Sequence, residues 1–129
     1  MISDNGIVHL ASSHSVDAVL EKLLALLRAK AITIFAVVDH SGEAAKAGFE
    51  MHATKLVIFG NPKAGTPLML AAPDSALDLP LKILIAEGAD RQTRVSYNSP
   101  ASLQARYGLA PDLMANVAAV EQIAAAIAG

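Results

Sequence analysis

The sequence predicts one α+β domain that spans residues 1–129. A chain of 129 residues and 13.3 kDa suits one compact domain and is too short for two ordinary ones. Strand-like and helix-like segments alternate along most of it, but the strand-like segments 79–87 and 93–97 follow each other with no helix between them. Two adjacent strands with no helix between them argue against a purely parallel, doubly wound sheet. A flavodoxin-like α/β fold, which has such a sheet, is the structural alternative.

The first three elements are predicted as strand, helix and strand. Residues 7–11 follow Gly6 and are partly β-branched, which is typical of a short strand. From Val16 to about Lys30 apolar residues recur every three or four positions, as in an amphipathic helix, and Ser13 and Ser15 are candidate N-caps. Residues 31–38 are rich in β-branched side chains and predict a buried strand.

The middle of the chain is predicted as a short helix, a strand and a second short helix. The first helix covers 43–47 and ends at Gly48, a residue type that accepts the left-handed C-terminal position. The strand covers 55–59. After the turn-rich segment 60–67, Thr66 is the expected N-cap and Pro67 the expected first helical residue.

The last third is predicted as an antiparallel hairpin followed by two helices. The hairpin joins 79–87 to 93–97, and Ser99-Pro100 begins a helix that ends near Gly108. A final alanine-rich helix is expected over about 112–128. Because it is apolar nearly all round, it predicts a second buried face and hence a homodimer; the alternative is that alanine is simply a good helix former.

Composition excludes several classes of function. Hydrophobic residues make up 53%, charged residues 17%, and mean hydropathy is +0.43, which excludes a disordered chain. A net charge of −2 argues against nucleic acid as a partner. The chain has no Cys, which excludes thiolate sites and fits a reducing compartment. With no membrane-length apolar run and no basic, apolar leader in residues 1–6, we predict a soluble, cytoplasmic protein that binds no membrane.

The segment 60–66 invites comparison with a phosphate-binding loop. Two glycines with four residues between them follow a strand, but Gly65 is followed directly by Thr66, with no lysine between them. Nucleotide hydrolysis is therefore not expected. Binding of a small anion by Asn61, Lys63, Thr66 and the helix start is the functional interpretation, and a rigid turn is the structural alternative.

Four histidines are scattered along the chain, and none forms a metal-binding motif. His9, His14, His40 and His52 lack the spacing of a zinc helix, so we predict no metal and no cofactor. His40, beside Asp39, is the candidate general base of a cofactor-free enzyme, with a solvated turn as the alternative.

Several segments together resemble an uncharacterised family, the domain of unknown function 302. They are His40 with the short Ala-rich helix after it, residues 47–50, 57–69 with the Phe-Gly-Asn-Pro sequence, 78–82 and 96–100. The similarity covers about residues 6–109. The resemblance implies a two-layer fold with a curved, mostly antiparallel sheet, a dimer, and no established reaction or ligand. The family's usual Leu-Arg-Pro-Thr before the third strand is Met-His-Ala-Thr at 51–54 here.

These observations lead to one main hypothesis and two alternatives. The main hypothesis is a homodimer that binds a small molecule, with an anion as one candidate. Its site lies where the predicted binding residues converge, namely His40, His52, Asn61, Lys63, Thr66 and Tyr97. The alternatives are an enzyme with His40 as general base and a structural or regulatory module that binds another protein.

Overall fold

The computed structural model describes residues 5–129. Residues 1–4, which belong to the segment 1–6 considered above as a leader, lie outside the described residues. Its strands are β1 (Ile7–Ser12), β2 (Thr33–Asp39), β3 (Thr54–Gly60), β4 (Leu81–Glu87) and β5 (Thr93–Asn98). Its α-helices are α1 (Val16–Ala29), α2 (His40–Lys46), α3 (Pro62–Ala71), α4 (Pro100–Tyr107) and α5 (Ala119–Ala128). Two 3₁₀ segments are η1 (Pro73–Leu77) and η2 (Pro111–Asn116).

The five strands form one sheet in the order β1-β5-β4-β3-β2, and every neighbouring pair is antiparallel. This confirms the predicted α+β class and its antiparallel hairpin. The flavodoxin-like alternative is wrong, because that fold requires parallel strands. The edge strands are β1 and β2, with β5, β4 and β3 between them.

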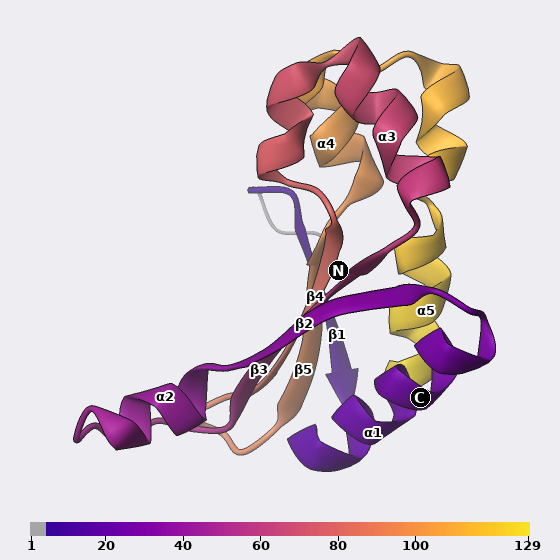
Figure 1. Ribbon diagram of the computed structural model, residues 1–129. Coiled ribbons are helices and arrows are strands. Elements are labelled where there is room, and N and C mark those ends of the chain that lie inside the picture. Colours follow the sequence, from indigo (N-terminus) through magenta and orange to yellow (C-terminus); the bar gives the residue numbers. More distant parts are fainter. Residues whose placement is uncertain (1–4) are drawn as a thin grey trace.

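Helices α1 and α5 pack together and contact the sheet, which makes the second layer (Figure 1). The predicted Ser15 cap of α1 is confirmed, since its hydroxyl accepts a hydrogen bond from the Ala18 N–H at 3.1 Å. The apolar stripe of α1 is buried against α5 and the inner side chains of the sheet. The fully buried members of this core include Val19, Leu23, Leu27, Val57, Ile83, Ile85, Val95 and Ile127.

The two ends of the sheet carry different structures. At one end α3, η1, α4 and η2 cluster around a second, smaller core formed by Leu68, Leu109 and Val117. At the other end α2 projects from the sheet, and none of its residues is buried (Figure 1). Strand β3 runs from the α2 end to the α3 end, so it separates these two regions by its own length.

Two helix predictions differ from the structure. The helix after β3 begins at Pro62, not Pro67, because the Asn61 side chain caps it by accepting a hydrogen bond from the Lys63 N–H. Pro67 lies inside this helix. The predicted continuous helix over 112–128 is two pieces, η2 and α5, and only one face of α5 is buried. No helix among the described residues is long and apolar enough to cross a membrane.

Candidate ligand cavity

The structure separates the predicted site residues into two groups instead of bringing them together. His40 and His52 lie where β2 ends and β3 begins, whereas Asn61, Lys63 and Thr66 follow the other end of β3. A strand of seven residues places its ends about 20 Å apart, at ~3.3 Å per residue. A single chain therefore does not form the convergent site that the sequence suggested.

The N-terminus of α3 has no free amide for an anion. Pro62 has no N–H, and the Lys63 N–H donates to Asn61 Oδ1 at 2.9 Å. The next two amides, of Ala64 and Gly65, donate to the Asn61 carbonyl at 2.8 and 3.0 Å. All the donors that would cradle an anion are thus used inside the helix, so this geometry favours a ligand of a different kind.

A cavity of about 280 Å³ lies beside α3, at the end of β3. Most of its wall is apolar. It is lined by Phe35, Gly60, Asn61, Pro62, Ala64, Gly65, Thr66, Met69, Leu79, Pro80, Leu81, Asn116 and Val117. Asn61 and Thr66 are the predicted site residues that line it, while Lys63 is exposed and Tyr97 lies elsewhere. Its volume is near the lower limit of ordinary ligand pockets, about 300–1,000 Å³.

Gly65 is one of the residues that line this cavity. A Cβ built on Gly65 would meet only the Met69 methyl group, at 4.0 Å, so no crowding requires a glycine there. Gly65 also has no positive φ. Because glycine inside a helix costs about 0.5–1 kcal/mol relative to alanine, this position loses stability without a steric reason. A larger side chain at this position would therefore have room beside the cavity that Gly65 lines.

Two polar side chains, those of Thr66 and Asn116, line the cavity beside its apolar wall. Asn116 Nδ2 donates to the Ala64 carbonyl at 3.0 Å, which fixes η2 against α3. Within the described chain, Asn116 Oδ1 and the Thr66 hydroxyl form no hydrogen bond. An acceptor and a hydroxyl are thus available to a bound molecule, next to apolar walls.

At the opposite end of β3, Asp39 is used as a helix cap and does not orient His40. Its carboxylate accepts hydrogen bonds from the Gly42 N–H at 2.9 Å and the Ser41 hydroxyl at 2.8 Å, and pairs with Lys55 Nζ at 3.0 Å. These contacts lower the pKa of Asp39 to about 2. The proposed acid–base pair of His40 with Asp39 therefore lacks its second member.

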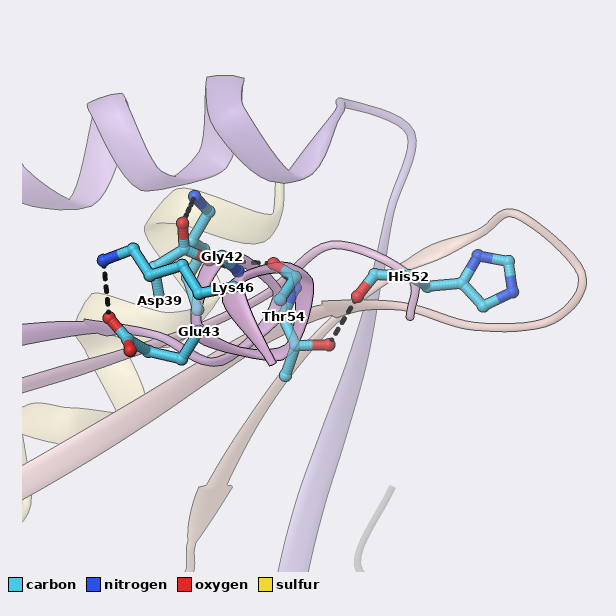
Figure 2. A network of polar contacts seen from close by, with 8 residues as sticks. Asp39, Gly42, Glu43, Lys46, His52 and Thr54 are labelled. Carbon is cyan, nitrogen blue, oxygen red and sulfur yellow. Dashed lines mark hydrogen bonds and ion pairs between the residues drawn. The ribbon is translucent and has the colours of Figure 1, made fainter. Parts of the chain in front are cut away.

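His52 belongs to a separate contact. Its Nδ1 lies 3.0 Å from Oε1 of Glu87, on the neighbouring strand β4, and its carbonyl accepts from the Thr54 hydroxyl at 2.9 Å. The imidazole points away from the Asp39 cap (Figure 2). His52 therefore has no contact that would join it to His40 in a catalytic pair.

The remaining candidates lie in the sheet or at the surface. Tyr97 is 8% exposed within the main core, and burial, with the nearby Glu121 carboxylate, raises its pKa. His9 Nδ1 lies 2.7 Å from the Ser96 hydroxyl, and His14 is exposed at the entrance to α1. Among the described residues no three His, Asp or Glu side chains are placed to hold a metal ion.

Most of the cavity wall was not predicted from the sequence. Phe35, Met69, Leu79 and Val117 look like ordinary core residues in the sequence, and no periodicity joins them. Gly65 gave no signal either, because the sequence places it in the segment predicted as a turn before the helix.

Comparison with known proteins identifies the family. The family model described as "Domain of unknown function DUF302" matches residues 8–128. The chain belongs to the DUF302 family. The crystal structure of an uncharacterized conserved DUF302 protein from Bacillus stearothermophilus has the same fold, with a TM-score of 0.77 and 15% identity over 95% of each chain.

Relatives with a functional name are longer proteins. The fluoride-specific ion channel FluC 1 of Brucella suis biovar 1 is 37% identical over 108 residues, which is 84% of this chain and 42% of that protein. FluC 2 of Brucella melitensis biotype 1 is also 37% identical over 108 residues, and 40% of its length is covered. This chain thus spans about two-fifths of the relatives it matches.

Proposed function

We propose that this DUF302 protein binds a small, mainly apolar molecule in the cavity beside α3. The observation that carries the proposal is the cavity of about 280 Å³ with its mostly apolar wall, in which the helix residue Gly65 has no side chain although no crowding requires a glycine there. The apolar wall suits a hydrocarbon or aromatic body, and Thr66 and Asn116 suit one hydroxyl or carbonyl group on it. The occupied amides of α3 argue for a neutral polar group over an anionic one.

Binding of a homologous series of alcohols tests this proposal. We expect 1-butanol to 1-octanol to raise the melting temperature saturably, with affinity increasing along the series by ~0.8 kcal/mol per buried methylene until the cavity is full. The matching carboxylates should bind more weakly at each length. A melting temperature that no alcohol raises saturably would contradict the proposal.

A graded substitution at Gly65 provides the matched control. Gly65→Leu extends into the cavity and should abolish alcohol binding, whereas Gly65→Ala should weaken it slightly. Gly65→Ala should also raise the free energy of unfolding by about 0.5–1 kcal/mol, because helix propensity improves. Loss of binding in Gly65→Leu, with Gly65→Ala more stable than the wild type, separates a filled cavity from a damaged fold. Equal binding by wild type and Gly65→Leu would place the ligand elsewhere.

A second candidate function comes from the relatives named as fluoride channels. The similarity covers about two-fifths of their length, and the described part of this chain has no helix that could cross a membrane. We infer a regulatory module that acts beside a fluoride channel. The test is fluoride tolerance of cells that express a channel with and without this chain. If the chain changes fluoride tolerance and Gly65→Leu abolishes that change, ligand binding and channel regulation are linked. If the chain leaves fluoride tolerance unchanged, the regulatory function is wrong.

A further inference from the structure

A β-bulge in β2 places an aromatic ring in the wall of the cavity. The pairing of β2 with β3 shifts between Ile34 and Ala36, which makes Phe35 the extra residue of the bulge. Ile34 packs against the main core, whereas Phe35 lines the cavity and is 50% exposed. Bulges commonly redirect a side chain at the edge of a sheet. The bulge therefore leaves the Phe35 ring accessible to a bound molecule.

Phe35 lies close to Gly60 and Pro80, which line the same cavity. A Cβ built on Gly60 would lie 3.9 Å from Phe35 Cε2 and 3.4 Å from Pro80 Cβ. Gly60 itself has no side chain, so nothing from this position of β3 fills the space beside the two rings. This part of the wall thus offers the aromatic ring of Phe35 and the pyrrolidine ring of Pro80 to a flat ligand.

The composition of the wall favours an aromatic ligand over a saturated one. Two aromatic rings in contact gain binding free energy beyond the area that they bury, and a thioether sulfur in contact with a ring adds to this gain. Phe35 supplies the aromatic partner and Met69 the thioether. The volume fits one ring with a substituent, since an apolar cavity of about 150 Å³ binds benzene and this one measures about 280 Å³.

The polar group of the ligand is constrained by Asn116. Its Nδ2 donates to the Ala64 carbonyl at 3.0 Å, which fixes the orientation of the side-chain amide. The oxygen of this amide, Oδ1, can only accept a hydrogen bond, so a ligand that pairs with it must carry a donor. A phenolic hydroxyl is a stronger donor than an aliphatic one because it is more acidic. A hydroxyl on an aromatic ring therefore matches both the apolar and the polar part of the cavity.

We propose that the ligand of this cavity is a small phenol, whose ring packs on Phe35 and whose hydroxyl donates a hydrogen bond to Asn116 Oδ1. Phe35 and Asn116 then determine specificity, one for the ring and the other for the hydroxyl. This assignment names the class of ligand and rests on the proposed function. A saturated cyclic alcohol satisfies Asn116 but gains less from Phe35, and an aromatic hydrocarbon does the reverse.

Phenol and cyclohexanol test the contribution of Phe35, because they share the ring size and the hydroxyl group. NMR titration of the whole chain should show that phenol binds about two- to tenfold more tightly than cyclohexanol. Phe35→Leu should make the two affinities about equal. Phe49→Leu, which changes an exposed phenylalanine outside the cavity, is the matched control and should preserve the preference. A preference that is absent in the wild type, or that Phe35→Leu leaves unchanged, would overturn the role of Phe35.

Phenol and toluene test the hydrogen bond to Asn116, because toluene has the same shape and no hydroxyl. Asn116→Leu should weaken phenol binding about tenfold and toluene binding less than about twofold, since only phenol loses a hydrogen bond. Asn116→Asp keeps an acceptor but loses the donor to Ala64, and it should bind phenol more tightly than Asn116→Leu does. Equal weakening of both ligands in Asn116→Leu, with no recovery in Asn116→Asp, would mean that Asn116 only holds η2 in place. That result would overturn the assignment of the hydroxyl.

A comparison with 1-octanol separates this assignment from the proposed function. If the wild type binds 1-octanol but binds phenol no more tightly than cyclohexanol, the cavity binds apolar molecules and the assignment to phenols is wrong. If the wild type binds none of 1-octanol, phenol and toluene, the proposed function is wrong and the assignment is wrong with it. Saturable shifts of the Gly60 and Gly65 amide signals on addition of phenol would support both, because these residues line the cavity.

Discussion

The two ends of β3 begin with similar local chemistry and differ in what surrounds them. At each end a strand meets a short helix whose N-cap is a side-chain oxygen, from Asn61 for α3 and from Asp39 for α2. Helix α3 buries Leu68 to 1% exposure in the small core with η2. Helix α2 buries nothing, and Phe49 after it is 69% exposed.

This contrast shows that capping starts a helix but does not decide what the helix encloses. Helix α3 packs with η1 and η2, and α4 contacts both of these 3₁₀ segments, so four elements share one small core and leave a cavity between them. Helix α2 has only β3 as a substantial neighbour. The cavity end is therefore packed from four elements, whereas α2 rests mainly on one strand.

The largest expected effect is the loss of the small core at the cavity end. Leu68→Ala should lower the free energy of unfolding by about 2–5 kcal/mol, because it removes a fully buried side chain. Leu70→Ala, two residues on in α3 where the side chain is 80% exposed, should change it by less than about 0.5 kcal/mol. Urea denaturation of both variants measures the difference. Equal losses would mean that burial does not distinguish the two faces of α3.

A smaller effect is expected from the cap of α3. Asn61→Ala removes the acceptor of the Lys63 N–H and should cost about 1 kcal/mol. Asn61→Asp retains an acceptor at the helix N-terminus and should restore the wild-type urea midpoint or exceed it. If Asn61→Asp is as unstable as Asn61→Ala, the cap does not contribute as the structure indicates.

At the α2 end the Asp39 cap should make stability depend on pH in the acid range. The pKa of Asp39 is lowered from 3.8 to about 2, so its ionised form favours the folded state. This contribution is fully present above pH 4 and is lost as the pH falls through the folded value. Asp39→Asn does not titrate, so its stability deficit relative to wild type should shrink between pH 4 and pH 2. A deficit independent of pH in urea titrations would exclude the ionised cap.

The smallest effect on stability is expected from the exposed residues that follow α2. Phe49→Ser with Met51→Ser should change the free energy of unfolding by less than about 0.5 kcal/mol, because neither side chain is buried. Urea denaturation of the double variant and the wild type measures this change. A loss as large as that of Leu68→Ala would show that these side chains pack on their own chain.

Local features of the sequence were sufficient for most of the fold. The stripe of α1 with its Ser15 cap, the antiparallel hairpin of β4 and β5, and the end of α4 at Gly108, where φ is +62°, follow from patterns within a few residues. The start of α3 was mispredicted because two prolines each suited the first helical turn. The Asn61 side chain, which caps the helix before Pro62, decides between them.

The candidate site depended on contacts between distant parts of the chain. The sequence identified Asn61 and Thr66 through turn chemistry but could not join them to Phe35 or Asn116, because no local pattern relates residues on different elements. It also could not show that β3 separates His40 from Asn61, since that follows from the antiparallel direction of the strands. Sequence alone thus determined the elements and the fold class, which depend on neighbouring residues, and the tertiary structure decided which side chains share a cavity and which remain exposed.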